Sequence, residues 1–569
     1  MVNSRQGLLK IKKNMKSKVI NNHRFNWVND QINDYSIYFV GGCWWQKNYY
    51  TEKKACEKIK KIFEQFLNDQ ESFHIKAIKE QILEFTGNYA FIIDSPHYII
   101  ACTDKIRSYP IFYAQTSDGF CISNSALDLQ NNAKLIEYDN DSVIEFQMSG
   151  FVTGSNTLYR GLHQLQGGEF LVFTKNNHNL LLEKHFTYFP SNLYELSEDD
   201  LLKKHDEAIN LTFSKLVDSL DGAPVWVPLS GGLDSRLILA KMIELGYENL
   251  NTFTYGIPQL WEVKCAREIA KSAGIKWQFI LYNPHEIKKT YHTVEREEYY
   301  RFGSGLCSVP FVNEYFALKY LIEKKVIPDD AVIINGQSGD FLTGGHIPDG
   351  LEKTKNTIVS FEYLVNLIIK KHFSLWLNLK SSDHSKVIEE KIGNILLPFI
   401  TESMSLDMAA GAYELHEWQE RQCKYVVNGQ RAYDWFGFDW RLPLWSDELM
   451  EFWRDVPWRI KFGQRLYKKY LTHYNPENLF NLEIKVNRNY CPPFLKLPSR
   501  IYTVLAKIFD LDADFFNRTI IKYFGAYAPY YPQRSFYAFL KDSRYHRNTV
   551  SYHSKILLDN VLITGLKQK

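Results

Sequence analysis

A short apolar segment followed by two serines, two glycines and an aspartate constrains the fold of this chain more than any other feature. Residues 225–229 read VWVPL, residues 230–235 read SGGLDS, and residues 236–241 continue with the spacing of a helix. Glycines let the backbone pass close to an anion, and the N–H groups that open a helix point at it with the positive end of the dipole. The pattern predicts a strand, a phosphate-binding loop and a helix.

The loop also carries Asp234, whose charge would by itself repel a phosphate. A divalent cation that bridges the carboxylate and the phosphate oxygens removes this repulsion, and Mg2+ suits such oxygen ligands. Ser230 and Ser235 add hydroxyl groups on either side. We therefore expect a magnesium-nucleotide site. The alternative is a tight strand-to-helix turn in which Asp234 caps the helix.

Strand and helix patterns alternate after this loop. Residues 250–256 (LNTFTYG) and 277–281 (WQFIL) are predicted strands, separated by a helix at 262–273 that Gly274 ends. Such a series implies a parallel sheet with right-handed crossovers, and ligands bind at the carboxyl ends of its strands. We therefore predict an α/β fold for this part of the chain.

A second glycine-rich loop follows another β-branched run. Residues 331–335 (AVIIN) precede residues 336–345 (GQSGDFLTGG), and the same topological rule places this loop at the nucleotide edge of the sheet. It offers Asp340, which together with Asp234 would complete a magnesium site. The alternative is an ordinary glycine-rich turn in which Asp340 bonds to its own backbone.

The regions before and after this sheet have different patterns. Short apolar runs before residue 190, such as SIYFVGG, NYAFIID, YIIACTD, PIFYAQ, GFCIS and EFLVF, predict a mostly antiparallel α+β domain. Beyond about residue 350 the pattern is chiefly helical. We expect a flexible basic leader at 1–34, a first domain at 35–190, a second at 195–500 and a helical or irregular C-terminal extension at 501–569.

Composition excludes several classes of protein. Lysine and arginine number 68 against 65 aspartates and glutamates, so no global charge favours nucleic acid. The eight cysteines form no CxxC pair, which is typical of a reducing compartment without a zinc site or a disulfide framework. No apolar segment is long enough for a signal peptide or a membrane span. We expect a cytoplasmic protein, and a homodimer is left open.

The two loops, in this order, resemble the asparagine synthetase family (class B, glutamine-hydrolysing type) of PP-loop ATP pyrophosphatases. GQSGDFLTGG is similar to the GEGADELFGG of that family, and residues 441–457 (RLPLWSDELMEFWRDVP) resemble its RVPFLD-type segment. FTGNYAFIID and CTDKIRSYPIFYA resemble its glutaminase domain. The resemblance implies an N-terminal α+β sandwich of the Ntn-hydrolase type, followed by a PP-loop synthetase domain with a largely helical C-terminal part.

The resemblance also implies ATP and Mg2+ as cofactors and a two-step ligation. A substrate carboxylate is adenylated with release of pyrophosphate, and ammonia or an amine then displaces AMP. Magnesium would be held by Asp234 and Asp340. The nucleotide-binding residues would be Leu229, Ser230, Gly231, Gly232, Leu233, Ser235, Thr254, Tyr255, Gly256 and Gly336. Lys485 would assist the adenylate, with a solvated surface lysine as the alternative.

Two departures from the family concern the nitrogen donor. Family members that hydrolyse glutamine use an N-terminal cysteine as nucleophile, whereas Val2 follows Met1 here and Cys43 lies deep in the chain. We therefore expect residues 35–190 to be a degenerate glutaminase domain. Gln337 replaces the family's glutamate, which is implicated in positioning or activating ammonia, and a glutamine cannot take up a proton.

Several functions remain open at this point. The generic one is an ATP-dependent amide ligase of the asparagine synthase type, as in asparagine biosynthesis. Alternatives are an intramolecular cyclase of the β-lactam synthetase or lasso-peptide type, an enzyme that amidates uronic acids of surface polysaccharides, and a catalytically inactive interaction protein. A tRNA-modifying PP-loop enzyme is disfavoured because the sequence shows neither a catalytic cysteine pair nor a basic RNA-binding surface.

Overall fold

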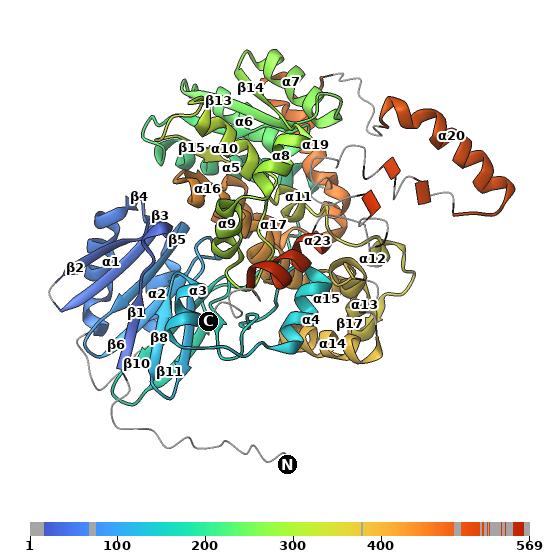
Figure 1. Cartoon of the computed structure of the whole chain (residues 1–569). Coiled ribbons are helices and arrows are strands. Elements are labelled where there is room, and N and C mark those ends of the chain that lie inside the picture. Colours follow the sequence, from blue (N-terminus) through green and yellow to red (C-terminus); the bar gives the residue numbers. More distant parts are fainter. Residues whose placement is uncertain are drawn as a thin grey trace. The chain divides into compact units, whose positions relative to one another are not determined.

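The computed structural model describes residues 16–32, 34–67, 75–376, 379, 381–482 and 491–512, together with 515–516, 520–521, 523, 536–537, 541 and 550–562. The chain divides into two compact units. Figure 1 colours the chain along its sequence, from blue at the N-terminus to red at the C-terminus. The first comprises Met1–Asn140 and Ser155–Phe186, and the second comprises Asp141–Gly154 and Thr187–Lys569.

The first unit contains two β-sheets. The larger has the strand order β11-β10-β6-β5-β3-β2, with β4 paired to β3, and its pairs are antiparallel. The smaller has the order β1-β8-β7-β9, in which β1 and β8 are parallel and the other pairs antiparallel. The strands are β1 (Lys16–Ile20), β2 (Val28–Ile32), β3 (Tyr35–Trp45), β4 (Asn48–Thr51), β5 (Phe85–Asp94), β6 (Tyr98–Thr103), β7 (Phe112–Thr116), β8 (Gly119–Ser123), β9 (His163–Gln164), β10 (Glu169–Thr174) and β11 (Asn179–Lys184). The mostly antiparallel α+β domain is confirmed.

Alternating side chains of the larger sheet build the layers of this unit. Val172 of β10 belongs to the core beneath helix α1 (Glu52–Leu67), where Phe63 is fully buried. The next residue, Phe173, points the other way and stacks on Phe120 of β8, with ring centroids 4.2 Å apart. Burying one such ring stabilises the fold by about 2–3 kcal/mol. Helices α2 (Ile75–Leu83) and α3 (Ala126–Asn132) pack against the larger and the smaller sheet, respectively. Helix and sheets thus form the sandwich that we expected.

Part of the predicted flexible leader is in fact a component of the sheets. Strand β1 pairs in parallel with β8, from Lys16 opposite Gly119 to Ile20 opposite Ser123, and β2 pairs with β3. The Ser123 hydroxyl donates to the carbonyl of Ile20 at 2.7 Å. The expectation was wrong for these strands because it rested on local basic charge, whereas their backbones pair with other strands: β1 with a partner about a hundred residues away and β2 with the strand that follows it. Residues 1–15 lie outside the described part of the chain.

The second unit contains a five-stranded sheet in which every neighbouring pair is parallel. Its strand order is β14-β13-β12-β15-β18. The strands are β12 (Val225–Pro228), β13 (Leu250–Gly256), β14 (Lys276–Leu281), β15 (Val332–Ile334) and β18 (Asp439–Arg441). The predicted parallel sheet and the α/β class are confirmed, and β18 is a strand that no pattern predicted.

The central strand β12 is buried on both faces. Val225, Trp226 and Val227 are at most 2% exposed, as expected for a parallel strand that is enclosed on two sides. Helix α6 (Leu233–Glu244) follows β12 and α7 (Trp261–Ala273) follows β13, as predicted. Helix α7 ends at Gly274, whose φ of +68° is left-handed and therefore favours glycine.

The strand order creates a topological switch point between β12 and β15. From β12 the chain proceeds to β13 and β14 on one side, and it then returns to β15 and β18 on the other side. Connections that leave adjacent strands in opposite directions open a crevice at the carboxyl ends of those strands. The two glycine-rich loops, which follow β12 and β15, therefore flank this crevice.

The rest of the second unit is mainly helical, as predicted beyond residue 350. Its main helices include α5 (Glu198–Asp218), α13 (Phe361–His372), α14 (Ser382–Leu396), α15 (Leu406–His416), α17 (Asp447–Asp455), α19 (Arg465–Tyr474) and α20 (Pro493–Ile508). Helix α15 continues into a π-helical segment, Glu417–Val426, a rare conformation that is frequent at functional sites. Among the described residues, every helix is too short or too polar to cross a membrane.

Candidate functional site

The first loop closes on itself through its two serines. The backbone N–H of Ser230 donates to Oγ of Ser235 at 3.1 Å, and the two hydroxyl oxygens are also 3.1 Å apart. The N–H of Gly232 donates to Oγ of Ser230 at 3.1 Å. No described side chain caps α6, which begins at Leu233, so a ligand can bond to the N–H groups of its first turn. This geometry suits an anion.

Gly231 and Arg236 fix this loop to its surroundings. A Cβ atom on Gly231 would lie 2.6 Å from Cζ3 of Trp261 and 2.8 Å from Cβ of Cys265, so α7 packs directly on the loop backbone. The buried Arg236 donates to the carbonyl of Gly231 at 3.1 Å and to that of Leu479 at 3.3 Å. Close packing, rather than an unusual backbone conformation, therefore requires glycine at position 231.

The second loop touches the first backbone to backbone. A Cβ atom on Gly336 would lie 3.0 Å from the backbone nitrogen of Ser235, and one on Gly339 would lie 2.5 Å from Oδ1 of Asp234. Gly339 begins α11 (Gly339–Leu342), the short helix that carries Asp340. The structure thus brings together the two loops whose proximity the sheet topology predicted.

Asp234 lies in this contact and bonds to Tyr467. The Tyr467 hydroxyl donates to Oδ1 of Asp234 at 3.1 Å. Burial, and then the negative charge of Asp340, raises the pKa of Asp234 to about 7, although hydrogen bonds from Tyr467 and from the backbone of Asp340 act in the opposite direction. A cation close to both carboxylates would relieve their repulsion.

The chemistry of these two carboxylates fits magnesium. Mg2+ prefers oxygen ligands and is usually held by one or two carboxylates together with substrate phosphates and water. Within the described ranges, no three His, Cys, Asp or Glu side chains gather closely enough to hold a metal ion. A magnesium ion at Asp234 and Asp340 would therefore need phosphate oxygens to complete its coordination.

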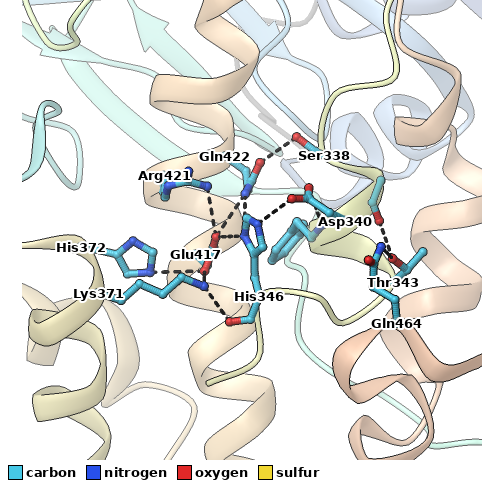
Figure 2. Close-up of polar contacts among 12 residues, drawn as sticks. Ser338, Asp340, Thr343, His346, Lys371, His372, Glu417, Arg421, Gln422 and Gln464 are labelled. Atoms are coloured by element: carbon cyan, nitrogen blue, oxygen red, sulfur yellow. Dashed lines mark hydrogen bonds and ion pairs between the residues drawn. The ribbon is translucent and has the colours of Figure 1, made fainter. Parts of the chain in front are cut away.

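Asp340 belongs to a polar network that no sequence motif predicted (Figure 2). Its Oδ2 lies 2.9 Å from Nε2 of His346, and Nδ1 of the same ring bonds to the buried Glu417. Desolvation alone would raise the pKa of Asp340, but the hydrogen bond and charge of His346 hold it below its ordinary value. Burial alone would lower the pKa of His346, but Glu417 and Asp340 raise it to about 9. Sequence analysis missed both His346 and Glu417.

A pocket of about 390 Å³ opens at the carboxyl ends of the strands. Its lining is Pro228, Leu229, Ser230, Gly232, Asp234, Ser235, Phe253, Thr254, Tyr255, Gly256, Leu260, Glu262, Asn313, Glu314, Asn335, Gly336 and Gln337. Phe253, Tyr255 and Leu260 of this lining are apolar or aromatic and suit a planar base. The residues of the first loop offer N–H and hydroxyl groups, which suit phosphates.

Most of the predicted nucleotide-binding residues line this pocket. They are Leu229, Ser230, Gly232, Ser235, Thr254, Tyr255, Gly256 and Gly336, and Asp234 and Gln337 join them. Gly231 faces α7, and Leu233 and Asp340 also lie outside the lining. Lys485 falls in residues 483–490, outside the described part of the chain.

A further carboxyl group in the pocket, Glu314, was not predicted. The Tyr433 hydroxyl donates to it, Asn335 Nδ2 is 3.5 Å from its Oε1, and burial raises its pKa despite these hydrogen bonds. Gln337 lies in the same lining, and its Oε1 accepts a hydrogen bond from Gln430 at 2.5 Å. No motif surrounds Glu314 in the sequence, so only folding could reveal its position.

Cys43 in the first unit has the properties of a structural thiol. It lies on β3 and is 1% exposed. Burial, and then the neighbouring Cys56, raises the pKa of Cys43 to about 12. Because the thiolate is the nucleophilic form, such a thiol is unreactive near neutral pH.

Comparison with known proteins adds one family match. Residues 218–485, which include both loops, match the family model described as asparagine synthase. No curated protein matches. Similar solved structures include the allosteric regulatory enzyme of purine biosynthesis (10% identity, TM-score 0.18, 45% of this chain and 62% of that one). Another is glutamine phosphoribosylpyrophosphate amidotransferase from B. subtilis in complex with ADP and GMP (11% identity, TM-score 0.17, 54% and 62%). The matches thus span less than two thirds of either chain.

Proposed function

We propose that this protein is an ATP-dependent ligase that forms an amide bond through an acyl adenylate; the match of residues 218–485 to the asparagine synthase family model supports this. The observation that carries the proposal is the contact between the two loops. Gly339 lets the segment that bears Asp340 approach the carboxylate of Asp234 at the switch point of the sheet. The two carboxylates, next to uncapped helix N–H groups, suit a magnesium-nucleotide.

ATP would bind with its phosphates on the first loop and its base near β13. Ser230, Ser235 and the first turn of α6 would donate to phosphate oxygens, and Thr254, Tyr255 and Gly256 would lie beside the base. Asp234 and Asp340 would hold Mg2+, which would supply positive charge against the pyrophosphate. The pocket lining, which contains Asp234 but not Asp340, supports the assignments to the first loop and to β13, and the oxygen chemistry of the two carboxylates supports the assignment of Mg2+.

In the first step, an oxygen of the substrate carboxylate would attack the α-phosphorus of ATP. A new P–O bond forms, the bond to the β-phosphate breaks, and pyrophosphate leaves with the electron pair. Preorganised N–H groups of the first loop would stabilise the charge that develops, a contribution that often dominates catalysis. Lys485 remains a predicted second source of positive charge.

In the second step, a nitrogen nucleophile would attack the acyl carbon, and AMP would leave with the electrons of the C–O bond. The nitrogen must also lose a proton. Gln337 cannot take up this proton. We assign the role to Glu314, a carboxylate of the same pocket whose raised pKa suits a general base.

The nitrogen donor follows from the properties of the first unit. The buried Cys43 does not suit glutamine hydrolysis, so ammonia would come from solution or from a partner protein, or the nucleophile would be an amine of the substrate itself. An intramolecular amine would make the protein a cyclase of the β-lactam synthetase or lasso-peptide type. Free ammonia would fit the amidation of aspartate or of a uronic acid.

ATP–pyrophosphate exchange tests this function. The full chain would be incubated with Mg2+, ATP, labelled pyrophosphate and, in turn, aspartate, uronic acids and amino-carboxylic acids. We expect label to enter ATP with one class of acid, and AMP to accumulate when ammonium or the matching amine is added. Absence of ATP binding by calorimetry, together with absence of exchange with every acid, would contradict the proposal.

A further inference from the structure

We propose that Glu417, acting through His346, is a positioning residue that holds Asp340 ready for the magnesium-nucleotide. The inference rests on the proposed function, since it assumes that Asp340 serves the nucleotide site. It adds two residues to that site, His346 and Glu417. Neither lies in the pocket lining, so both would act through Asp340 rather than on the ligand.

The chain of contacts runs from a buried anion to an exposed one. Glu417 has a fully buried side chain, whereas the side chain of Asp340 is 53% exposed. His346 connects them, with Nδ1 on Glu417 and Nε2 2.9 Å from Asp340 Oδ2. Because each ring nitrogen of His346 bonds to a different carboxylate, the orientation of the ring is fixed. Figure 2 shows this series of contacts.

Glu417 is well suited to be the fixed end of this series. One of its oxygens accepts from Arg421 at 3.3 Å and from Gln422 at 3.2 Å. Its other oxygen lies 3.2 Å from Nε2 of His372 and 3.5 Å from Nζ of Lys371. Four partners from two helices thus restrain one buried carboxylate.

The same π segment, Glu417–Val426, holds the second loop at another point. Ser338, just before α11, donates from Oγ to Gln422 Oε1 at 2.7 Å. Ser338 has a φ of +67°, a conformation that a non-glycine residue keeps only when its surroundings fix it. The π segment therefore anchors the loop on both sides of Asp340, through Gln422 before it and through Glu417 and His346 after it.

An exposed carboxylate without such restraint would sample several rotamers and lose entropy when it met a cation. Hydrogen bonds to a metal-binding carboxylate fix its direction, and removing such an outer partner typically weakens metal affinity about 10- to 100-fold. Glu417 and His346 are placed to have this effect on Asp340, although they need not touch either magnesium or ATP.

Calorimetric titration of ATP into the full-length protein at a series of Mg2+ concentrations tests the inference. Mg2+ is expected to increase the affinity for ATP, and the midpoint of this increase is the Mg2+ concentration at which half of it is reached. For Glu417→Gln this midpoint should rise about 10- to 100-fold. ATP binding measured in EDTA should stay unchanged, because the first loop is intact. His346→Ala should give the same shift and also serves if Glu417→Gln fails to fold.

The chain offers a matched control in Glu420. It lies on the same π segment, is equally buried and forms an ion pair with Lys424 at 2.5 Å. Its described partners do not include His346 or Asp340. Glu420→Gln should therefore keep the wild-type Mg2+ requirement. An equal shift in Glu420→Gln and Glu417→Gln would show a general structural effect and overturn the inference.

The double variant, Glu417→Gln with His346→Ala, tests whether Glu417 acts on Asp340 through His346 or independently of it. If Glu417 acts through His346, the double variant should shift the Mg2+ requirement no further than either single variant. Multiplied effects would overturn the inference. Wild-type Mg2+ dependence in Glu417→Gln and His346→Ala would overturn it and leave the proposed function intact. If the wild-type protein bound no ATP at any Mg2+ concentration, both would fail.

Discussion

At the scale of single residues, Gly339 sets how closely the two loops approach. Any Cβ at this position would lie 2.5 Å from the Asp234 carboxylate and 2.6 Å from a methyl group of Leu444. Neither contact can be relieved by moving a long flexible side chain. The absence of a side chain at Gly339 is thus a requirement of the site and of the core beneath it.

Gly339→Ala is expected to destabilise the protein by about 1–3 kcal/mol, because overpacking forces the surrounding groups to shift. ATP binding in the presence of Mg2+ should fall with it. Denaturant unfolding and calorimetry measure the two effects. Gly393→Ala, in α14, is the control, since its Cβ would find its nearest neighbour at 3.6 Å. That variant should gain about 0.5–1 kcal/mol from helix propensity. Equal behaviour of the two variants would contradict the role of close contact.

A variant of Glu314 should affect only the second step of the proposed ligation. Glu314→Gln keeps the size of the side chain but removes the proton acceptor, so amide formation should fall about 10²- to 10⁴-fold. ATP–pyrophosphate exchange with the accepted acid should stay within a few-fold of the wild-type rate. Comparison of exchange with amide formation checks this. Loss of exchange and of ATP binding would show instead that Glu314 contacts the nucleotide.

At the scale of elements, helix α5 packs on α17 through an unusual buried histidine. His205 of α5 is 1% exposed and stacks on Phe452 of α17, with ring centroids 5.2 Å apart. Among the described residues, neither of its ring nitrogens has a hydrogen-bond partner. Burial lowers the pKa of His205 to about 3. The ring is therefore neutral in the folded protein.

This histidine should make the second unit sensitive to acid. An unfolded histidine titrates near 6.5, so below that pH the unfolded chain binds a proton that the folded chain rejects, and stability falls with pH. Between pH 7 and pH 4.5 the wild type should lose about 2–3 kcal/mol more than His205→Leu. Denaturant unfolding at both pH values measures the difference. His285 is exposed, so His285→Leu should lose as much stability between the two pH values as the wild type. If the wild type and His205→Leu lost stability in parallel, His205 would not be the source of the acid sensitivity.

At the scale of the whole molecule, the two units differ in what they contribute. The asparagine synthase match falls at residues 218–485, within the second unit, which also contains both loops, the pocket and the polar network. The first unit is a closed sandwich whose sheets carry Cys43 in the core. The division of the chain thus supports the proposal that ligation takes place in the second unit without glutamine hydrolysis by the first.

Cys43→Ala tests this division. We expect the wild-type protein to release no glutamate from glutamine, because a buried thiol with a pKa of about 12 provides almost no thiolate at neutral pH. Cys43→Ala should then leave ammonium-dependent AMP formation unchanged. A coupled glutamate assay and AMP release measure the two reactions. Glutamate release by the wild type that disappears in Cys43→Ala would show an active glutaminase.

Much of the site could be predicted because its signals are local. Residues 230–235 carry their glycines, serines and aspartate within one turn, and the alternation of strand and helix around them implies a parallel sheet. Together with the second glycine-rich loop at residues 336–345, this pattern predicts Asp234 and Asp340 at one edge of the sheet. Strands β3, β5, β6, β7, β8 and β10 of the first unit could likewise be predicted, because apolar runs between turn residues need no distant partner to be recognised.

Local patterns were therefore sufficient to predict the class of the fold, and they also predict the phosphate loop and the role of its two carboxylates. Folding was needed to bring Glu417 behind His346 and Glu314 into the pocket, and to pair β1 with β8 in the first unit. The physical reason is that burial, hydrogen bonding and pKa arise from contacts between residues far apart in the chain. A local pattern specifies its own strand, loop or helix, but it does not specify the partner that will desolvate or orient a side chain.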